Sequence, residues 1–377
     1  MQRFSGGIHI YGGDFLDTTH SQWSPETLHE EPPDMTDSTI LVTGISGFIA
    51  KHCAVELLKH GYRVRGTVRN LATAEGVNQT LAEHADVSEL EFVAANLLAD
   101  DGWAEAVKDI HGVLHLASPF PLAQPKDAEE LIRPAVDGTL RVLRAATAAG
   151  AKRFVQTSST MAVLYGHGHT RSTAHTESDW TDTDGPGVTA YGKSKTLAEL
   201  AARDFVAKHG AALHYASVNP GFVLGPLLDC NAGSSAELIA NCLRGKYPGC
   251  PKLSFPVVDV RDVAKAHRLA LETNEPTGGR YLAVASAVWF KDLMLPIKAR
   301  LGDRARKIPT RVLPNLAVWL VALFDPAARA ILPDLGYELR IDNSATRKAL
   351  GMDFIAHTES APAMAESLLS FGLVSDR

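Results

Sequence analysis

The feature that most restricts the fold of this chain is an alternation that begins near residue 39. Short runs of β-branched and apolar residues alternate with longer segments of helical pattern, an order typical of a parallel sheet with crossover helices. The strand candidates are residues 40–43, 63–68, 90–94, 112–117, 154–157 and 213–218. The helical segments 48–60, 131–149 and 191–209 are each followed by glycine, which commonly ends helices. These patterns predict an α/β fold built on a doubly wound parallel sheet.

A glycine-containing turn joins the first strand to the first helix. The segment reads ILVTGISGFIA over residues 40–50. Gly44 permits a tight turn, Gly47 lets the backbone approach a ligand closely, and Ala50 keeps the helix near the strand. Because free N–H groups at a helix N-terminus favour anions, the turn predicts a pyrophosphate site of a dinucleotide.

The second strand ends at Arg69, where NAD-binding proteins place an acidic residue that binds the ribose hydroxyls. A carboxylate there would repel a 2′-phosphate, whereas a guanidinium can pair with it. We therefore expect NADP as the cofactor, with NAD as the alternative. A solvated surface arginine is the other interpretation of Arg69, because sequence position does not fix the direction of a side chain.

Hydroxyl and amine groups follow in a pattern suited to hydride chemistry. The strand at 154–157 leads into Ser158 and Ser159, and YGKSK follows at residues 191–195. Tyr191 and Lys195 are four residues apart and share one face of a helix. Tyr191 would deliver a proton to a carbonyl oxygen, Lys195 would stabilise the phenolate, and Ser159 would hold the substrate oxygen. The pair alone could be a coincidence on a helix surface, but here it accompanies the glycine turn.

Composition narrows the set of partners. The chain has 377 residues, 45% of them apolar, and a net charge of −6 without a long basic run. Nucleic acid and an anionic membrane are therefore not expected, and a small molecule is. The four cysteines show no CxxC pair, which favours reduced thiols in a cytoplasm. The apolar run 316–324 is much shorter than the ~20 residues of a membrane span, so we predict a buried helix there.

The motifs together resemble the extended short-chain dehydrogenases/reductases. Within them, the group of dihydroflavonol reductases, cinnamoyl-CoA reductases and aldehyde or ketone reductases is the most similar. The resemblance covers nearly everything after residue 39. It rests on the segments VTGISGFIA (42–50), RGTVR (65–69), HLASP (115–119), TSS (157–159), YGKSKTLAE (191–199), NPGFVLGP (219–226) and VDVRDVA (258–264).

The resemblance implies roles for individual residues. The catalytic set would be Ser159, Tyr191 and Lys195, since the second serine of the TSS run is the family's triad member. The cofactor would be bound by Gly44, Ser46, Gly47, Phe48, Ile49, Arg69, Asn96, Leu97, Ala117, Ser118, Tyr191, Lys195, Pro220, Gly221, Val223 and Ser235. No metal is expected.

Several positions depart from the family pattern. Asn96 stands where an Asp usually contacts the adenine, and a basic residue expected shortly after Arg69 is missing. Ala135 stands where many extended members carry the Asn of a proton relay, which puts that relay in doubt. Leu164 stands where plant dihydroflavonol reductases carry a polar specificity residue, so a compact apolar or aromatic aldehyde or ketone is preferred over a flavonoid.

We expect the domains to follow the change of pattern after Pro220, where Pro and Gly become frequent. Residues 1–38 are predicted as a loose tail and residues 39–220 as the Rossmann NADP-binding domain. Residues 221–377 are predicted to form mainly a smaller substrate-binding lobe, with 254–272 packing back on the Rossmann domain. A monomer or a homodimer is expected.

Some conspicuous side chains have structural interpretations. The histidines His167, His169 and His175 lack the thiol or carboxylate spacing of a zinc site. Asp259 and Asp262 precede a helical segment and suit helix capping better than acid catalysis. We expect Glu177, Asp179 and Trp180 to order a loop beside the site. Apolar residues that either line a substrate pocket or belong to the core are Phe120, Leu164, Phe222, Leu227 and Tyr247.

Three functions fit these observations. The first is an NADP(H)-dependent reductase that interconverts a small carbonyl compound and its alcohol. The second is a sugar-nucleotide epimerase or dehydratase that recycles bound NAD, which Arg69 disfavours. The third is a non-catalytic NADP(H)-sensing binding protein, which the presence of Tyr191 disfavours.

Overall fold

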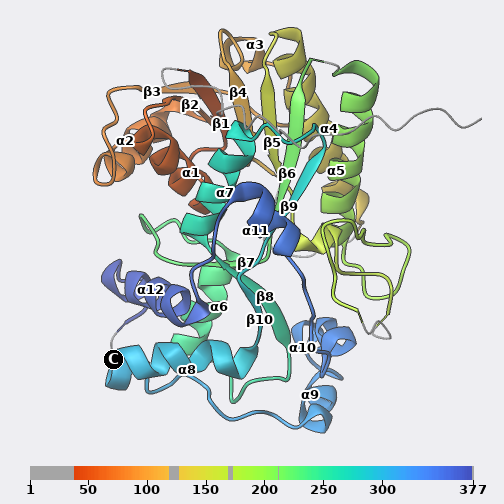
Figure 1. Cartoon of the computed structure of the whole chain (residues 1–377). Coiled ribbons are helices and arrows are strands. Elements are labelled where there is room, and N and C mark those ends of the chain that lie inside the picture. Colours follow the sequence, from red (N-terminus) through yellow and green to blue (C-terminus); the bar gives the residue numbers. More distant parts are fainter. Residues whose placement is uncertain (1–37, 119–126, 169–172, 211, 376–377) are drawn as a thin grey trace, which may run out of the picture. The chain divides into compact units, whose positions relative to one another are not determined.

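The computed structural model describes residues 38–118, 127–168, 173–210 and 212–375. A seven-stranded sheet, with every neighbouring pair parallel, has the order β3-β2-β1-β4-β5-β6-β9 (Figure 1). Its strands are β1 (Thr39–Thr43), β2 (Arg63–Val68), β3 (Leu90–Ala94), β4 (Gly112–His115), β5 (Arg153–Thr157), β6 (His214–Pro220) and β9 (Gly279–Ala283). The order runs outward from β1 in both directions, so the predicted doubly wound Rossmann sheet is confirmed.

The helices connect these strands as crossovers or extend the C-terminal half. They are α1 (Phe48–Lys59), α2 (Ala74–Ala82), α3 (Trp103–Ala106), α4 (Glu129–Ala148), α5 (Ala190–His209), α6 (Ser234–Leu243), α7 (Val260–Glu272), α8 (Phe290–Leu301), α9 (Asn315–Val321), α10 (Pro326–Ala330), α11 (Ser344–Leu350) and α12 (His357–Ser370). Short 3-10 turns are η1 (Leu71–Thr73), η2 (Thr160–Ala162), η3 (Gly302–Ala305) and η4 (Leu332–Asp334).

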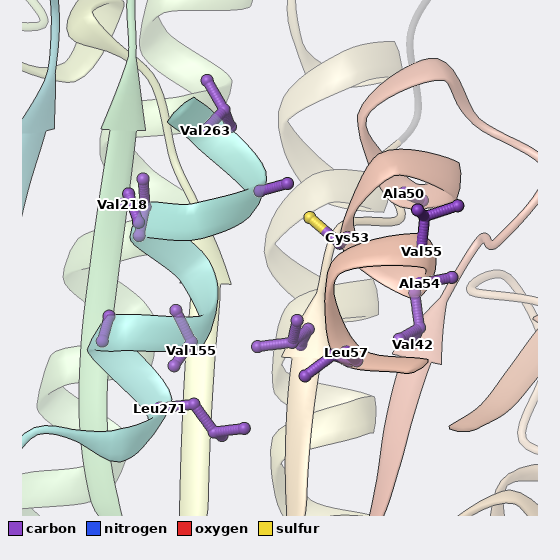
Figure 2. Close-up of a cluster of buried hydrophobic side chains, with 14 of the residues drawn as sticks. Val42, Ala50, Cys53, Ala54, Val55, Leu57, Val155, Val218, Val263 and Leu271 are labelled. Atoms are coloured by element: carbon purple, nitrogen blue, oxygen red, sulfur yellow. The ribbon is translucent and has the colours of Figure 1, made fainter. Parts of the chain in front are cut away.

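Helices cover both faces of the sheet. On one face α1 and α7 pack over β1, β5 and β6, with Cys53 and Leu57 of α1 and Val263 and Leu271 of α7 buried among strand valines (Figure 2). On the other face α4 and α5 lie together and enclose a second cluster that contains Leu143. Burial on both faces explains why the central strand β1, with the sequence TILVT, is an apolar run rather than an alternating pattern.

The six expected strands are present, and β2 and β3 have the predicted bounds. The fourth strand is shorter than predicted: it ends at His115 rather than at residue 117. The reason is local, because the N–H groups of Leu116 and Ala117 each donate a hydrogen bond of 3.0 Å to Thr43 Oγ1 instead of to a neighbouring strand. The chain therefore leaves the sheet where β1 ends.

The seventh strand, β9, has no counterpart among the predicted strands. It pairs in parallel with β6, with Val218 opposite Tyr281. Its sequence is only five residues long and contains both Gly279 and Arg280. The glycine and the arginine leave only three residues of apolar run, and the strand conformation depends on pairing with β6.

A smaller lobe is built from residues after Pro220, but it is interleaved in sequence with the sheet domain, because β9 belongs to the large sheet. Its sheet has the order β10-β8-β7 and consists of β7 (Phe222–Leu224), β8 (Ser254–Asp259) and β10 (Ser286–Trp289). Helices α6, α8 and α12 share a hydrophobic cluster with it. Within residues 254–272, β8 belongs to this lobe, whereas α7 packs against α1 and β6 of the large sheet.

The apolar run 316–324 is not the buried helix that its composition predicts. Residues 315–321 form α9, but Leu316, Trp319 and Phe324 are 69%, 52% and 89% exposed, while Val318 and Ala322 are buried. Only one narrow side of this segment packs against the protein. The prediction was wrong because an apolar run shows low polarity but not which neighbours cover it.

Candidate active site

The glycine turn forms the floor of the candidate site. Gly44 has a φ of +64°, and a Cβ there would lie 3.1 Å from the Cβ of Ala117, so glycine is required by both backbone conformation and space. The Gly44 N–H donates to Thr67 Oγ1 (2.9 Å), which ties the turn to β2. Gly47 is the N-cap of α1 and offers no side chain to the first turn. The N–H groups of the first turn of α1, which include those of Phe48 and Ile49, therefore have no side-chain cap, and such a helix start favours a pyrophosphate.

The predicted adenosine-side residues lie after β2 and β3. Arg69 is exposed, and it forms no hydrogen bond or ion pair with another described residue. Asn96 is also exposed, and its Oδ1 accepts a hydrogen bond from the N–H of Leu98 (3.1 Å). The amide oxygen of Asn96 thus belongs to a local turn. Leu97 packs against α4, since a Cβ on Gly138 would lie 3.1 Å from its Cβ.

Ser159 and Tyr191 meet at the carboxyl end of β5. Ser159 is the N-cap of η2, where its Oγ accepts from the N–H of Met161 (3.1 Å). Tyr191 lies in the first turn of α5, whose N-cap Thr189 accepts from the N–H of Gly192. A hydrogen bond joins the Tyr191 and Ser159 side chains, so the structure brings these two predicted residues together.

Lys195 lies one helical turn beyond Tyr191. Its Nζ is 5.9 Å from the centre of the Tyr191 ring and donates to the carbonyl oxygen of Thr157 (3.2 Å). This hydrogen bond anchors the ammonium group to the end of β5. Ser159, Tyr191 and Lys195 therefore lie together at one corner of the sheet edge, although Tyr191 and Lys195 follow Ser159 by 32 and 36 residues in the sequence.

Burial is the largest influence on the pKa values of Tyr191 and Lys195. Burial raises the pKa of Tyr191 to about 12, and the hydrogen bond with Ser159 opposes that rise. Burial also lowers the pKa of Lys195 to about 8, while the nearby negative charge of Glu199 opposes that fall. Lys195 is thus mostly charged at pH 7 and loses its charge in mildly alkaline solution.

The remaining predicted cofactor residues lie around the same edge. Pro220 ends β6, and Gly221 donates its N–H to Ala283 O (3.1 Å), while a Cβ on Gly221 would lie 2.1 Å from Pro256 O. Val223 is buried in β7. Ser235 lies in the first turn of α6, 7% exposed, and Ser118 is the last residue described before the gap at 119–126.

A loop after β7 crosses to the glycine turn, and the sequence patterns did not single it out. Asn231 Nδ2 donates to Ser46 O (3.0 Å), and Asp229 forms an ion pair with Lys51, which is 2% exposed on α1. Gly233, the N-cap of α6, also lies near Phe48, since a Cβ on Gly233 would be 4.0 Å from the Phe48 ring. The cradle is therefore bounded by the C-terminal lobe as well as by the sheet domain.

Other singled-out residues have structural partners. Asp259 caps α7 by accepting from the N–H of Arg261, as predicted, whereas Asp262 accepts from the N–H of Ile355 instead. Glu177 accepts from the N–H of Thr346 at 3.0 Å. Burial is clear for Leu164 and Leu227, which belong to hydrophobic clusters, while Tyr247 is 37% exposed. Phe120 lies outside the described residues.

The histidine-rich loop contributes polar contacts. His167 Nε2 lies 2.6 Å from the carbonyl oxygen of Trp180, and the N–H of His175 donates to Arg340 O (2.8 Å). His169 lies outside the described residues. Within the part of the chain that the structure describes, no group of three or more histidine, cysteine or acidic side chains could hold a metal ion.

The sheet order, the glycine turn and the Ser–Tyr–Lys corner define an oxidoreductase of the extended short-chain dehydrogenase/reductase class. The chain belongs to the NAD dependent epimerase/dehydratase family, whose model matches residues 40–283.

Among the helices that the structure describes, none has the length and apolar character needed to cross a membrane.

Several proteins to which the chain is similar are reductases by name. Cinnamoyl-CoA reductase CAD2 of Medicago truncatula is 37% identical over 261 residues, which cover 68% of this chain and 79% of that protein. Ketoreductase azaE of Aspergillus niger is 32% identical over 331 residues, covering 84% and 93%. The structure of yeast methylglyoxal/isovaleraldehyde reductase Gre2 complexed with NADPH has a TM-score of 0.72 at 27% identity, covering 89% of this chain and 99% of that one.

Proposed function

We propose that this protein is an NADP(H)-dependent reductase that interconverts a small apolar or aromatic aldehyde or ketone and its alcohol. The observation that carries the proposal is the corner formed by Tyr191, Ser159 and Lys195 at the sheet edge that also carries the glycine turn. A phenol held between a neutral donor and a cation suits proton transfer to a carbonyl oxygen.

The fit of the cofactor rests on the turn and on Arg69. The uncapped N-terminus of α1 and the left-handed backbone of Gly44, with a φ of +64°, fit a pyrophosphate-binding turn. Arg69 would pair with the 2′-phosphate of NADP(H), and the Gre2 structure that this chain is similar to was solved with NADPH. Under this proposal, residues 39–220 bind most of the cofactor. Residues 221–377 contribute Gly221, Val223 and Ser235 to its binding and mainly form the substrate lobe, while α7 and β9 pack on the sheet domain.

The chain's own residues would handle the proton. A bound NADPH supplies the hydride to the carbonyl carbon. Ser159 and Tyr191 donate hydrogen bonds to the carbonyl oxygen and orient it. As negative charge develops there, the Tyr191 O–H bond breaks and the proton forms the alcohol O–H. Lys195 stabilises the phenolate that remains until solvent restores its proton.

The substrate class is inferred from the apolar residues next to the Ser159 segment. Val163 and Leu164 directly follow η2, whose N-cap is Ser159, and they are buried in a hydrophobic cluster with Leu282. Apolar residues this near the site favour apolar or aromatic groups beside the carbonyl. Two of the similar proteins, cinnamoyl-CoA reductase and methylglyoxal/isovaleraldehyde reductase, are named for a thioester of an aromatic acid and for small aldehydes. The free thiols of all four cysteines suit a reducing compartment such as cytoplasm.

An initial-rate screen tests the proposal. NADPH and NADH oxidation are measured side by side with a panel of aliphatic and aromatic aldehydes and ketones. We expect turnover with NADPH, and loss of at least about a hundredfold in Tyr191→Phe, because the phenol is the proton donor. No turnover with any carbonyl, or equal rates for Tyr191→Phe, would contradict it. A tightly held NAD that co-purifies and does not exchange would instead support an epimerase or dehydratase.

A further inference from the structure

A buried carboxylate lies directly behind the candidate catalytic corner. Tyr191, Lys195 and Glu199 follow one another at four-residue intervals along one face of α5. Glu199 is 0% exposed. A carboxylate in such a place is costly unless it is paired and hydrogen-bonded, so its partners indicate why the position carries one.

One oxygen of Glu199 is bonded to the segment that carries Ser159. Ser158 Oγ donates to Glu199 Oε2 at 2.5 Å, and Asn219 Nδ2 donates to the same oxygen at 2.9 Å. The Asn219 amide also donates to the carbonyl oxygen of Ser159 at 3.2 Å. Glu199 thus fixes the backbone on which Ser159 stands through two short connections, one from the preceding residue and one from β6.

The other oxygen of Glu199 faces two guanidinium groups. Oε1 accepts from Arg280 Nε (2.8 Å) and Arg203 Nε (3.2 Å), and also from Ser217 Oγ (2.9 Å). Arg280 is itself held against the Trp180 ring, with its guanidinium carbon 3.7 Å from the ring centre. The carboxylate is therefore held by partners from β6, β9 and α5 at once.

We propose that Glu199 is a positioning residue of the reductase site: it fixes the Ser159 segment through Ser158 and Asn219, and it lies one helical turn beyond Lys195 on the same face of α5. This inference rests on the proposed reductase function. Glu199, in the third turn of α5, would thereby support the chemistry of Tyr191 and Lys195, which lie in the first two turns.

The charges around Glu199 support an ionised carboxylate. Burial acts to raise the pKa of Glu199, but Arg280 and Arg203 together with the hydrogen bonds from Ser158 and Asn219 bring it below its ordinary value. Lys195 has the opposite environment, because burial lowers its pKa to about 8 and Glu199 is the group that opposes the fall. Removing the negative charge should therefore lower the pKa of Lys195 further.

Two further titratable groups near Lys195 and Glu199, His115 and Tyr215, are neutral near pH 7. Burial lowers the pKa of His115 to about 3, with the charge of Lys195 acting in the same direction. Burial raises the pKa of Tyr215, with Glu199 adding to the rise. The charged and titratable groups that face Lys195 or Glu199 in the described residues are Tyr191, Arg203, Arg280, His115 and Tyr215.

Two variants and one control test the inference in the full-length protein. Glu199→Gln removes the charge but keeps the shape. Ser158→Ala removes the 2.5 Å hydrogen bond and leaves every charge in place, so it remains informative if Glu199→Gln does not fold. Thr196→Val is the matched control, since Thr196 is a fully buried polar residue of the same helix whose hydroxyl bonds only to Gly192 O among the described residues. Carbonyl reduction by NADPH is measured from pH 6 to 10, with NADPH binding and thermal unfolding alongside.

In Glu199→Gln the alkaline fall of kcat should move to lower pH by about one unit, the usual effect of a nearby opposite charge. Ser158→Ala should lose several-fold in kcat with the alkaline fall unmoved. NADPH binding should stay within about twofold in both, and Thr196→Val should change neither kcat nor the pH profile. A folded Glu199→Gln with the wild-type pH profile, or Ser158→Ala with the kcat of Thr196→Val, would overturn the inference. A wild-type protein without any carbonyl reduction refutes the proposed function instead.

Discussion

Replacing Lys195 by methionine should slow the reductase by about a hundredfold at pH 7. The Lys195 Nζ lies 5.9 Å from the Tyr191 ring centre. At an effective dielectric constant of ~20, opposite charges at that separation attract by about 2.8 kcal/mol, which corresponds to roughly two pKa units or a hundredfold in rate. Both reaction directions should slow equally, because they share a transition state in which the phenol proton is in transfer.

The advantage of lysine should disappear in alkaline solution. Because burial lowers the pKa of Lys195 to about 8, roughly nine-tenths of it is charged at pH 7 and roughly one part in a hundred at pH 10. The ratio of wild-type to Lys195→Met kcat should therefore fall from about 100 at pH 7 to about 2 at pH 10.

Initial rates with NADPH and a carbonyl substrate, measured at saturating concentrations across this pH range, give the ratio directly. Lys193→Met is the control: Lys193 lies on the same helix, 3.6 Å from Asp184, and its loss should leave kcat within about twofold. A ratio that does not change with pH would show that Lys195 acts through shape or cofactor contacts rather than through its charge. A ratio near one at pH 7 would refute its role altogether.

Three further outcomes are expected. Arg69→Ala should raise the KM for NADPH by about ten- to a hundredfold and leave that for NADH unchanged, because only the 2′-phosphate loses a charged partner; equal changes in steady-state assays with both cofactors contradict this. Burial lowers the pKa of His267 to about 4, so between pH 6.5 and pH 4 the unfolded chain binds a proton at this histidine that the folded chain does not, and the free energy of unfolding should fall as the pH falls. His267→Gln should reduce that fall in denaturant titrations. The raised pKa of Asp262, about 6, acts in the opposite sense. Phe324→Ser should change the free energy of unfolding by less than ~0.5 kcal/mol, whereas Leu143→Ala, at a fully buried position, should cost about 2 to 5 kcal/mol; similar costs would contradict the exposure of the 316–324 segment.

The sequence was sufficient for features that depend on neighbours along the chain. Parallel strands buried on both faces leave apolar runs, so six of the seven strands could be read directly, and β2 and β3 have the predicted bounds. The glycine turn and the four-residue spacing of Tyr191 and Lys195 are likewise local. The spacing continues to Glu199, so this residue could also have been noticed from the sequence.

Tertiary structure decided what depends on residues far apart in the chain. The partners of Glu199 come from positions as distant as Arg280, and Asn231 reaches Ser46 across 185 residues. Strand β9 forms because β6 is available beside it, and Phe324 is exposed because no element covers it among the residues described. Hydrophobicity and residue spacing show which conformations a segment can adopt. Strand pairing and burial also require a second segment beside it, and only the folded chain brings that segment into contact.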